Sequence, residues 1–120
     1  MNKRYNKRYN KNEQLANELR DFIIKNEFTN VRIYFNNKAY DWYSSSKEPI
    51  LINNIRPTEY FPTANNKTVS MSFEGNLYYP MNFGDNDNDF TTYNTIKSIF
   101  KKYGYYFEFG NAWNITAYDL

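Results

Sequence analysis

The chain has 120 residues, enough for one domain with a modest core, and its 15 basic and 13 acidic residues give a net charge of +2. It contains no cysteine and no histidine, which excludes disulfides, thiolate metal sites and histidine-based acid–base catalysis. No apolar run approaches the roughly 20 residues that cross a bilayer, and no apolar stretch follows the basic start as in a secretion signal. We therefore expect a cytoplasmic protein.

Positive charge is concentrated in the first eleven residues, the basic arm. Lys-Arg-Tyr-Asn occurs at 3–6 and again at 7–10, and Lys11 begins the tetrapeptide once more. The arm has five basic residues and no acidic one, leaving ten basic and 13 acidic residues in the rest of the chain. Such local charge is typical of anion-binding segments, and tyrosines can stack on bases. We predict nucleic-acid contacts at Lys3, Arg4, Tyr5, Lys7, Arg8, Tyr9 and Lys11; the alternative is a solubilising, disordered terminus.

An amphipathic helix is predicted over 12–27. Asn12 can cap it, Glu13 suits its first turn, and apolar residues follow at helical spacing. No proline or glycine separates the arm from this helix, so we expect residues 1–11 to be its frayed or helical extension. The remaining residues, 12–120, are predicted to form one domain that folds without the arm.

Strands are predicted next at 31–35 and 38–43, joined by a tight turn at Asn36–Asn37, with a short third strand at 50–52. Pro57 and Pro62 bracket an irregular stretch. The following strand, 68–74, alternates so that Val69, Met71 and Phe73 should face one way. Gly75–Asn76 is predicted to turn it into a returning strand at 77–79.

The last third of the chain predicts a loop at 84–89, a second amphipathic helix over 90–103 with Gly104 just beyond its end, and a hairpin of strands 105–109 and 112–118. Hairpins interspersed with two helices favour an α+β fold. We predict a single domain in which a twisted antiparallel sheet of five to seven strands packs with two amphipathic helices.

Residues that could carry chemistry are few. Asp85, Asp87 and Asp89 have the spacing of a calcium loop, but Phe90 and Ile96 stand where its glycine and glutamate belong, which favours an acidic helix cap. No paired carboxylates, glycine-rich phosphate loop or activated nucleophile is present, so we expect no enzymatic activity, cofactor or metal. Most aromatic residues are expected in the core, with Tyr40, Tyr43, Tyr78 and Tyr118 as candidates for an open sheet face.

The basic arm running into an amphipathic helix at 12–28, in a chain rich in Asn, Lys, Tyr and Ile, resembles small accessory proteins of phages and conjugative elements of low-GC Gram-positive bacteria. It is similar to some anti-CRISPR proteins, which inhibit type II CRISPR effector nucleases. The likeness is compositional and covers about the first quarter of the chain. Many anti-CRISPR proteins are acidic DNA mimics, a pattern from which the net charge of +2 departs.

The resemblance implies a non-enzymatic inhibitor from a mobile element, acting in the cytoplasm of a host bacterial cell. Its partner would be a CRISPR effector nuclease with its guide RNA, and the arm would contact RNA phosphates. The alternative is a general nucleic-acid-binding accessory protein of phage or plasmid replication or transfer.

Overall fold

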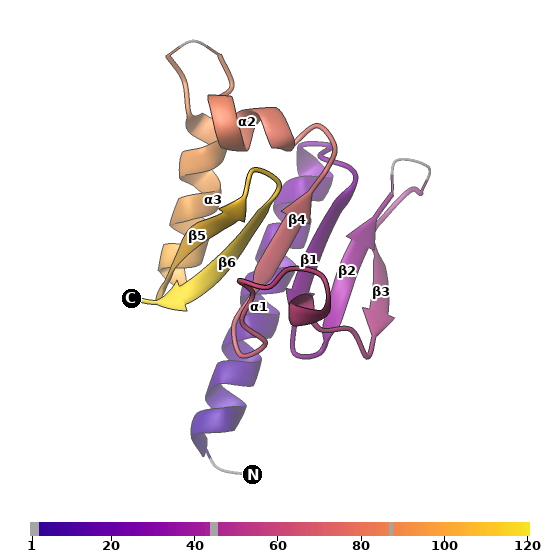
Figure 1. Ribbon diagram of the computed structural model, residues 1–120, viewed down its shortest axis with the longest axis vertical. Coiled ribbons are helices and arrows are strands. Elements are labelled where there is room, and N and C mark those ends of the chain that lie inside the picture. The colour runs from indigo at the N-terminus through magenta and orange to yellow at the C-terminus, as the bar shows by residue number, and fades with distance from the viewer. Residues whose placement is uncertain (1–2, 44–45, 87) are drawn as a thin grey trace.

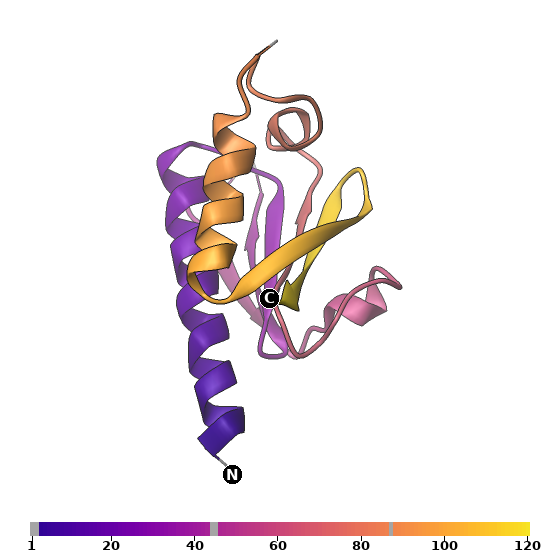
Figure 2. The same ribbon diagram turned by 90° about the vertical axis from the view of Figure 1, so that its left-hand side faces the viewer.

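A computed structural model describes residues 3–43, 46–86 and 88–120. Its centre is a six-stranded, entirely antiparallel sheet in the order β3-β2-β1-β4-β6-β5. Helices α1 (Lys3–Lys25) and α3 (Thr91–Lys102) cover one face of this sheet (Figures 1 and 2). The predicted α+β fold with two helices on an antiparallel sheet is confirmed. None of the helices in the described ranges combines the length and apolar character needed to cross a membrane.

The sheet is built around β1 (Val31–Phe35), which pairs with β2 (Lys38–Trp42) on one side and with β4 (Ser70–Phe73) on the other. Asn36 and Asn37 form the turn between β1 and β2 with φ of 51° and 61°, the left-handed conformation that asparagine tolerates in two-residue hairpins. The edges are β3 (Ile50–Asn53) and β5 (Tyr105–Asn111), and β6 (Asn114–Asp119) lies between β5 and β4.

The main core lies between the sheet and the two helices. Leu15, Leu19 and Ile23 of α1 are buried at helical spacing, and Ile96 and Phe100 of α3 are buried in the same core. The sheet contributes alternate residues of its strands. Val69, Met71 and Phe73 all belong to this core, as their alternation predicted.

Helix α3 has the ends that its sequence predicted. The Asp89 carboxylate accepts hydrogen bonds from the backbone N–H and the hydroxyl of Thr91, and Asp85 Oδ2 accepts from the backbone N–H of Thr92 at 2.9 Å. Both acids therefore stabilise the first turn of α3. Gly104 follows the helix with φ of 83°. Asp87 lies outside the described residues.

One predicted strand and one predicted helix cap are wrong. Residues 77–79 do not return as a strand, because α2 (Tyr78–Phe83) begins there and β4 pairs with β6 instead. Pro80 occupies the first turn of α2, where its missing N–H costs nothing. Asn12 does not cap α1, which continues back to Lys3; its buried side chain instead donates to the Lys67 carbonyl at 2.9 Å and accepts from the Tyr105 hydroxyl at 2.6 Å.

The second face of the sheet is only partly covered. The segment 54–69, which contains a short 3-10 turn at Pro57–Glu59, crosses this face on the side opposite the helices (Figure 2). Its Ile55 and Phe61 pack on Tyr34 and Ala39 of the sheet in a second, small core. The part of the face that this segment leaves uncovered forms a pocket.

Candidate functional site

Residues 3–11 of the basic arm are the first part of α1, and the start of this helix extends past the ends of the strands (Figures 1 and 2). The backbones of Lys3, Arg4 and Tyr5 are helical, and their side chains lie outside the described part of the chain. Lys7 is exposed to solvent. The start of the helix therefore lies beyond the folded body, with Lys7 exposed on it.

Arg8 and Lys11 are held by the C-terminal hairpin. The Arg8 guanidinium donates to Asp119 Oδ2 at 3.1 Å and to the Tyr105 hydroxyl at 3.4 Å. The hydrogen bond to Asp119 raises the pKa of Arg8, and the same bond lowers the pKa of Asp119. The Lys11 ammonium lies 4.2 Å from the centre of the Tyr105 ring, and burial together with the charge of Arg8 lowers the pKa of Lys11.

Tyr9 contacts the turn between β1 and β2. Its backbone carbonyl accepts a hydrogen bond from Asn36 Nδ2 at 2.9 Å, and its hydroxyl accepts one from the Lys38 ammonium at 3.4 Å. Lys38 also donates to Glu13 Oε1 at 2.9 Å. Of the predicted contact residues, the structure therefore brings Arg8, Tyr9 and Lys11 against the body, whereas Lys7 points to solvent.

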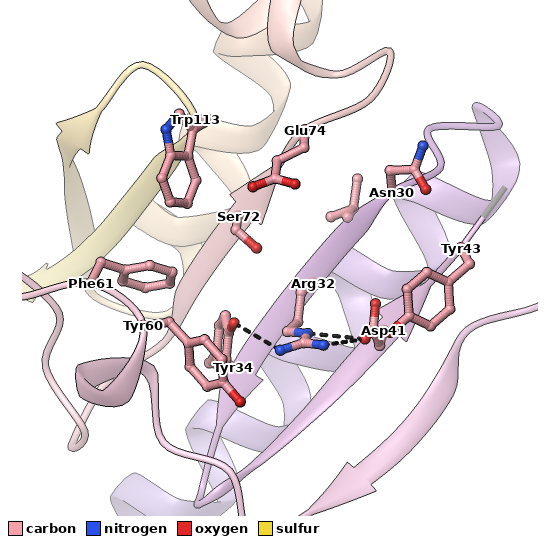
Figure 3. Close-up of a pocket in the computed structure, with 11 residues that line it drawn as sticks. Asn30, Arg32, Tyr34, Asp41, Tyr43, Tyr60, Phe61, Ser72, Glu74 and Trp113 are labelled. Atoms are coloured by element: carbon pink, nitrogen blue, oxygen red, sulfur yellow. Dashed lines mark hydrogen bonds and ion pairs between the residues drawn. The ribbon is translucent and has the colours of Figure 1, made fainter.

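The pocket on the second face of the sheet was not predicted as a site. It has a volume of about 430 Å³ and a charged floor formed by Arg32 of β1 and Asp41 of β2, with Ser72 of β4 beside them (Figure 3). These residues are neighbours across the strands, because Arg32 is paired in register with both Asp41 and Ser72. Successive residues of a strand point to opposite faces, so all three side chains leave the sheet on the face away from the helices.

An ion pair dominates the floor of the pocket. Asp41 Oδ2 accepts from Arg32 Nε at 3.0 Å and from Arg32 Nη2 at 2.5 Å, and Arg32 Nη1 donates to the Tyr34 hydroxyl at 3.3 Å. Burial disfavours the charged guanidinium, but the hydrogen bonds to Asp41 and Tyr34 outweigh it and raise the pKa of Arg32 above its usual range. Burial also raises the pKa of the Tyr34 hydroxyl. The Asp41 side chain is 6% exposed and that of Arg32 is 21% exposed.

Aromatic side chains from three separate segments form the walls. Tyr60 and Phe61 come from the covering segment 54–69, Trp113 from the turn between β5 and β6, and Tyr43 from the end of β2 (Figure 3). Phe61 meets the Trp113 ring edge to face at 6.2 Å between centroids. Glu74, Asn30 and Val31 complete the described lining beyond Ser72 and Arg32.

The tyrosines that the sequence suggested for an open face have different positions. Tyr43 does line the pocket and is 49% exposed. Tyr40 is on the helix side instead, where its hydroxyl donates to Asn17 Oδ1 at 2.6 Å. Tyr78 belongs to α2, and Tyr118 donates its hydroxyl to the Thr63 carbonyl at 3.2 Å. The oppositely charged residues at 32 and 41, equidistant from the Asn36–Asn37 turn, were the sequence signal for the pocket floor.

Within residues 3–43, 46–86 and 88–120, no three acidic side chains converge as a metal site. Comparison of the chain with protein-family models gave no match, and searches of curated proteins and of solved structures gave none either. The case for a function therefore rests on the basic arm and the aromatic pocket.

Proposed function

We propose that the protein is a non-enzymatic inhibitor from a mobile element that binds a host nucleoprotein, with the basic arm contacting RNA phosphates. The observation that carries this proposal is the continuity of α1: one unbroken helix from Lys3 to Lys25 carries the basic repeat, and its start extends beyond the body (Figure 1). The host partner suggested by the resemblance of the arm is a type II CRISPR effector carrying its guide RNA. The body would contact the protein part of that complex.

The described cations of the arm differ in whether they already contact the body. Lys7 is exposed and can meet a phosphate without losing a contact. Arg8 would have to leave Asp119, and Lys11 would have to leave the ring of Tyr105. Lys7 is therefore the first candidate for a phosphate contact, and we add Lys3 and Arg4 for their charge. Three such contacts correspond to a slope of log affinity against log salt of about −2 to −3.

The test measures binding to a guide-RNA-loaded type II effector and to free guide RNA by fluorescence anisotropy between 50 and 300 mM salt, chosen as roughly the range where such slopes are resolved. Changing Lys3, Arg4, Lys7 and Arg8 to alanine should flatten the slope to about −1 or less and abolish inhibition of target cleavage. Asp119→Asn should have the opposite effect and steepen the slope by about 1, because it releases Arg8 for a further phosphate.

The matched control changes four exposed lysines elsewhere, Lys25, Lys47, Lys97 and Lys101, to alanine. It alters the net charge by the same amount, so equal flattening by both variants would contradict a specific role of the arm. Undiminished inhibition by the arm variant would contradict the proposal outright. Salt-dependent binding to every RNA tested, without inhibition of the effector, would favour a general nucleic-acid-binding accessory protein of phage or plasmid replication.

A further inference from the structure

The pocket over β1, β2 and β4 is separate from the basic arm. It opens on the sheet face opposite α1, beside the covering segment 54–69 and the turn at Trp113, which together form one side of it (Figure 3). A volume of about 430 Å³ is in the range of sites that hold small organic groups. Its chemistry can therefore be considered independently of the proposed function.

The charges that line the pocket leave an excess of one negative charge. Among the described residues that line it, Arg32 is the one basic residue, and its guanidinium is already paired with Asp41. Glu74 is exposed at the other end of the lining, and no ion pair joins its carboxylate to a basic side chain of the described ranges. A ligand that brings a positive charge would be attracted to Glu74, whereas a phosphate would be repelled.

The aromatic walls favour a cation as well, because the face of an aromatic ring carries negative electrostatic potential. The pocket already demonstrates this preference with its own Arg32, whose Cζ lies 5.4 Å from the Tyr60 ring centre and 5.7 Å from that of Tyr34. Trp113 and Tyr43 offer further ring surface on opposite sides of the pocket, and Tyr43 is half exposed (Figure 3). Planar guanidinium groups stack on such rings and bind carboxylates through two hydrogen bonds.

We propose that this pocket binds the guanidinium group of an arginine side chain presented by a partner protein. The incoming group stacks on the aromatic walls and donates hydrogen bonds to the Glu74 carboxylate, while Asp41 keeps Arg32 neutralised beneath it. A nucleobase could stack on the same rings, but its attached phosphate would approach an acidic site. The pocket therefore selects a basic protein surface over a nucleic acid.

The test uses the whole protein labelled with ¹⁵N and the probe N-acetyl-arginine amide. The two tryptophans give an internal comparison: Trp113 lines the pocket, whereas Trp42 is buried on the helix side of the sheet and donates its indole N–H to the Ser46 carbonyl. The indole N–H signal of Trp113 should shift with a Kd of about 1–10 mM, as expected for a single side chain, while the Trp42 signal stays in place.

N-acetyl-citrulline amide, which has nearly the same shape without the charge, should bind at least about tenfold more weakly. Glu74→Gln should weaken arginine binding by about tenfold and Tyr43→Ala by severalfold, whereas Glu48→Gln, an equal charge change at an exposed position outside the pocket, should leave it unchanged. Equal binding of citrulline and arginine would overturn the proposal. Tighter binding of guanosine monophosphate than of the arginine probe would also overturn it and identify a nucleobase site.

Discussion

We predict that replacing the two members of the Arg32–Asp41 ion pair has unequal effects on stability, because the two side chains differ in exposure. Arg32→Met leaves the Asp41 carboxylate, which is 6% exposed, without either of its N–H donors. Removing one partner of a buried pair costs about 3–5 kcal/mol, and water in the adjoining pocket reduces this to about 2–3 kcal/mol. Asp41→Asn leaves a guanidinium that is 21% exposed and can turn toward that water, so we expect a loss of about 1–2 kcal/mol.

Thermal unfolding at neutral pH measures these losses directly. For a domain of this size, Arg32→Met should lower Tm by about 8–15 °C and Asp41→Asn by about half as much. The double change Arg32→Met with Asp41→Leu should recover most of the loss, because it removes the isolated charge and fills the space with apolar atoms. The three variants separate the cost of an unpaired charge from the net contribution of the pair. Equal Tm losses for the two single variants would refute this account of the pair.

Two further predictions concern the junction between the arm and the body. Removal of residues 1–6 should leave Tm within about 2 °C. Removal of residues 1–10 also deletes the Arg8 ion pair and the hydrogen bond to the Tyr9 carbonyl, and it should lower the free energy of unfolding in urea by about 1–2 kcal/mol. Equal losses of stability for the two truncations would show that these contacts contribute nothing. Arg8 lowers the pKa of Asp119, so the stabilisation from this carboxylate is present above the pKa of an unfolded aspartate and is lost as the pH falls below about 4. Asp119→Asn should accordingly cost under about 1 kcal/mol at pH 7 by the same measurement and progressively less as the pH falls through the lowered pKa of Asp119, and a cost that does not change with pH would contradict this linkage.

The sequence predicted those parts of the fold that depend on neighbouring residues. The strand at 31–35, the Asn36–Asn37 turn and the amphipathic helices all carry local patterns, and each is present in the structure. The error at 77–79 has a tertiary cause. Leu77-Tyr78-Tyr79 has the aromatic character of a strand, but Leu77 and Met81 are both buried in the main core, and their spacing of four residues suits a helix.

The candidate site likewise has one part that the local sequence predicts and another that depends on distant segments. The pairing of Arg32 with Asp41 follows from the register that a two-residue turn imposes, and could have been predicted. Tyr60 and Trp113 reach the pocket from segments far away in the chain, and no local pattern indicates where such residues will meet. The partner of Arg8 is likewise 111 residues distant, so the sequence could show the charge of the arm but not which of its cations the body neutralises.

The unbroken course of α1 also determines the rotational phase of the basic arm. At about 1.5 Å per residue the 23 residues of this helix span about 34 Å, whereas the seven residues of β5, the longest strand, span about 23 Å. The helix is longer than the sheet it covers, so part of it must overhang. Each residue turns the helix by about 100°. A single residue inserted between Lys7 and Arg8 would therefore rotate Lys7 to another side of the body while leaving its charge intact. Binding of a partner that contacts both arm and body therefore depends on the orientation of the arm as well as on its charge.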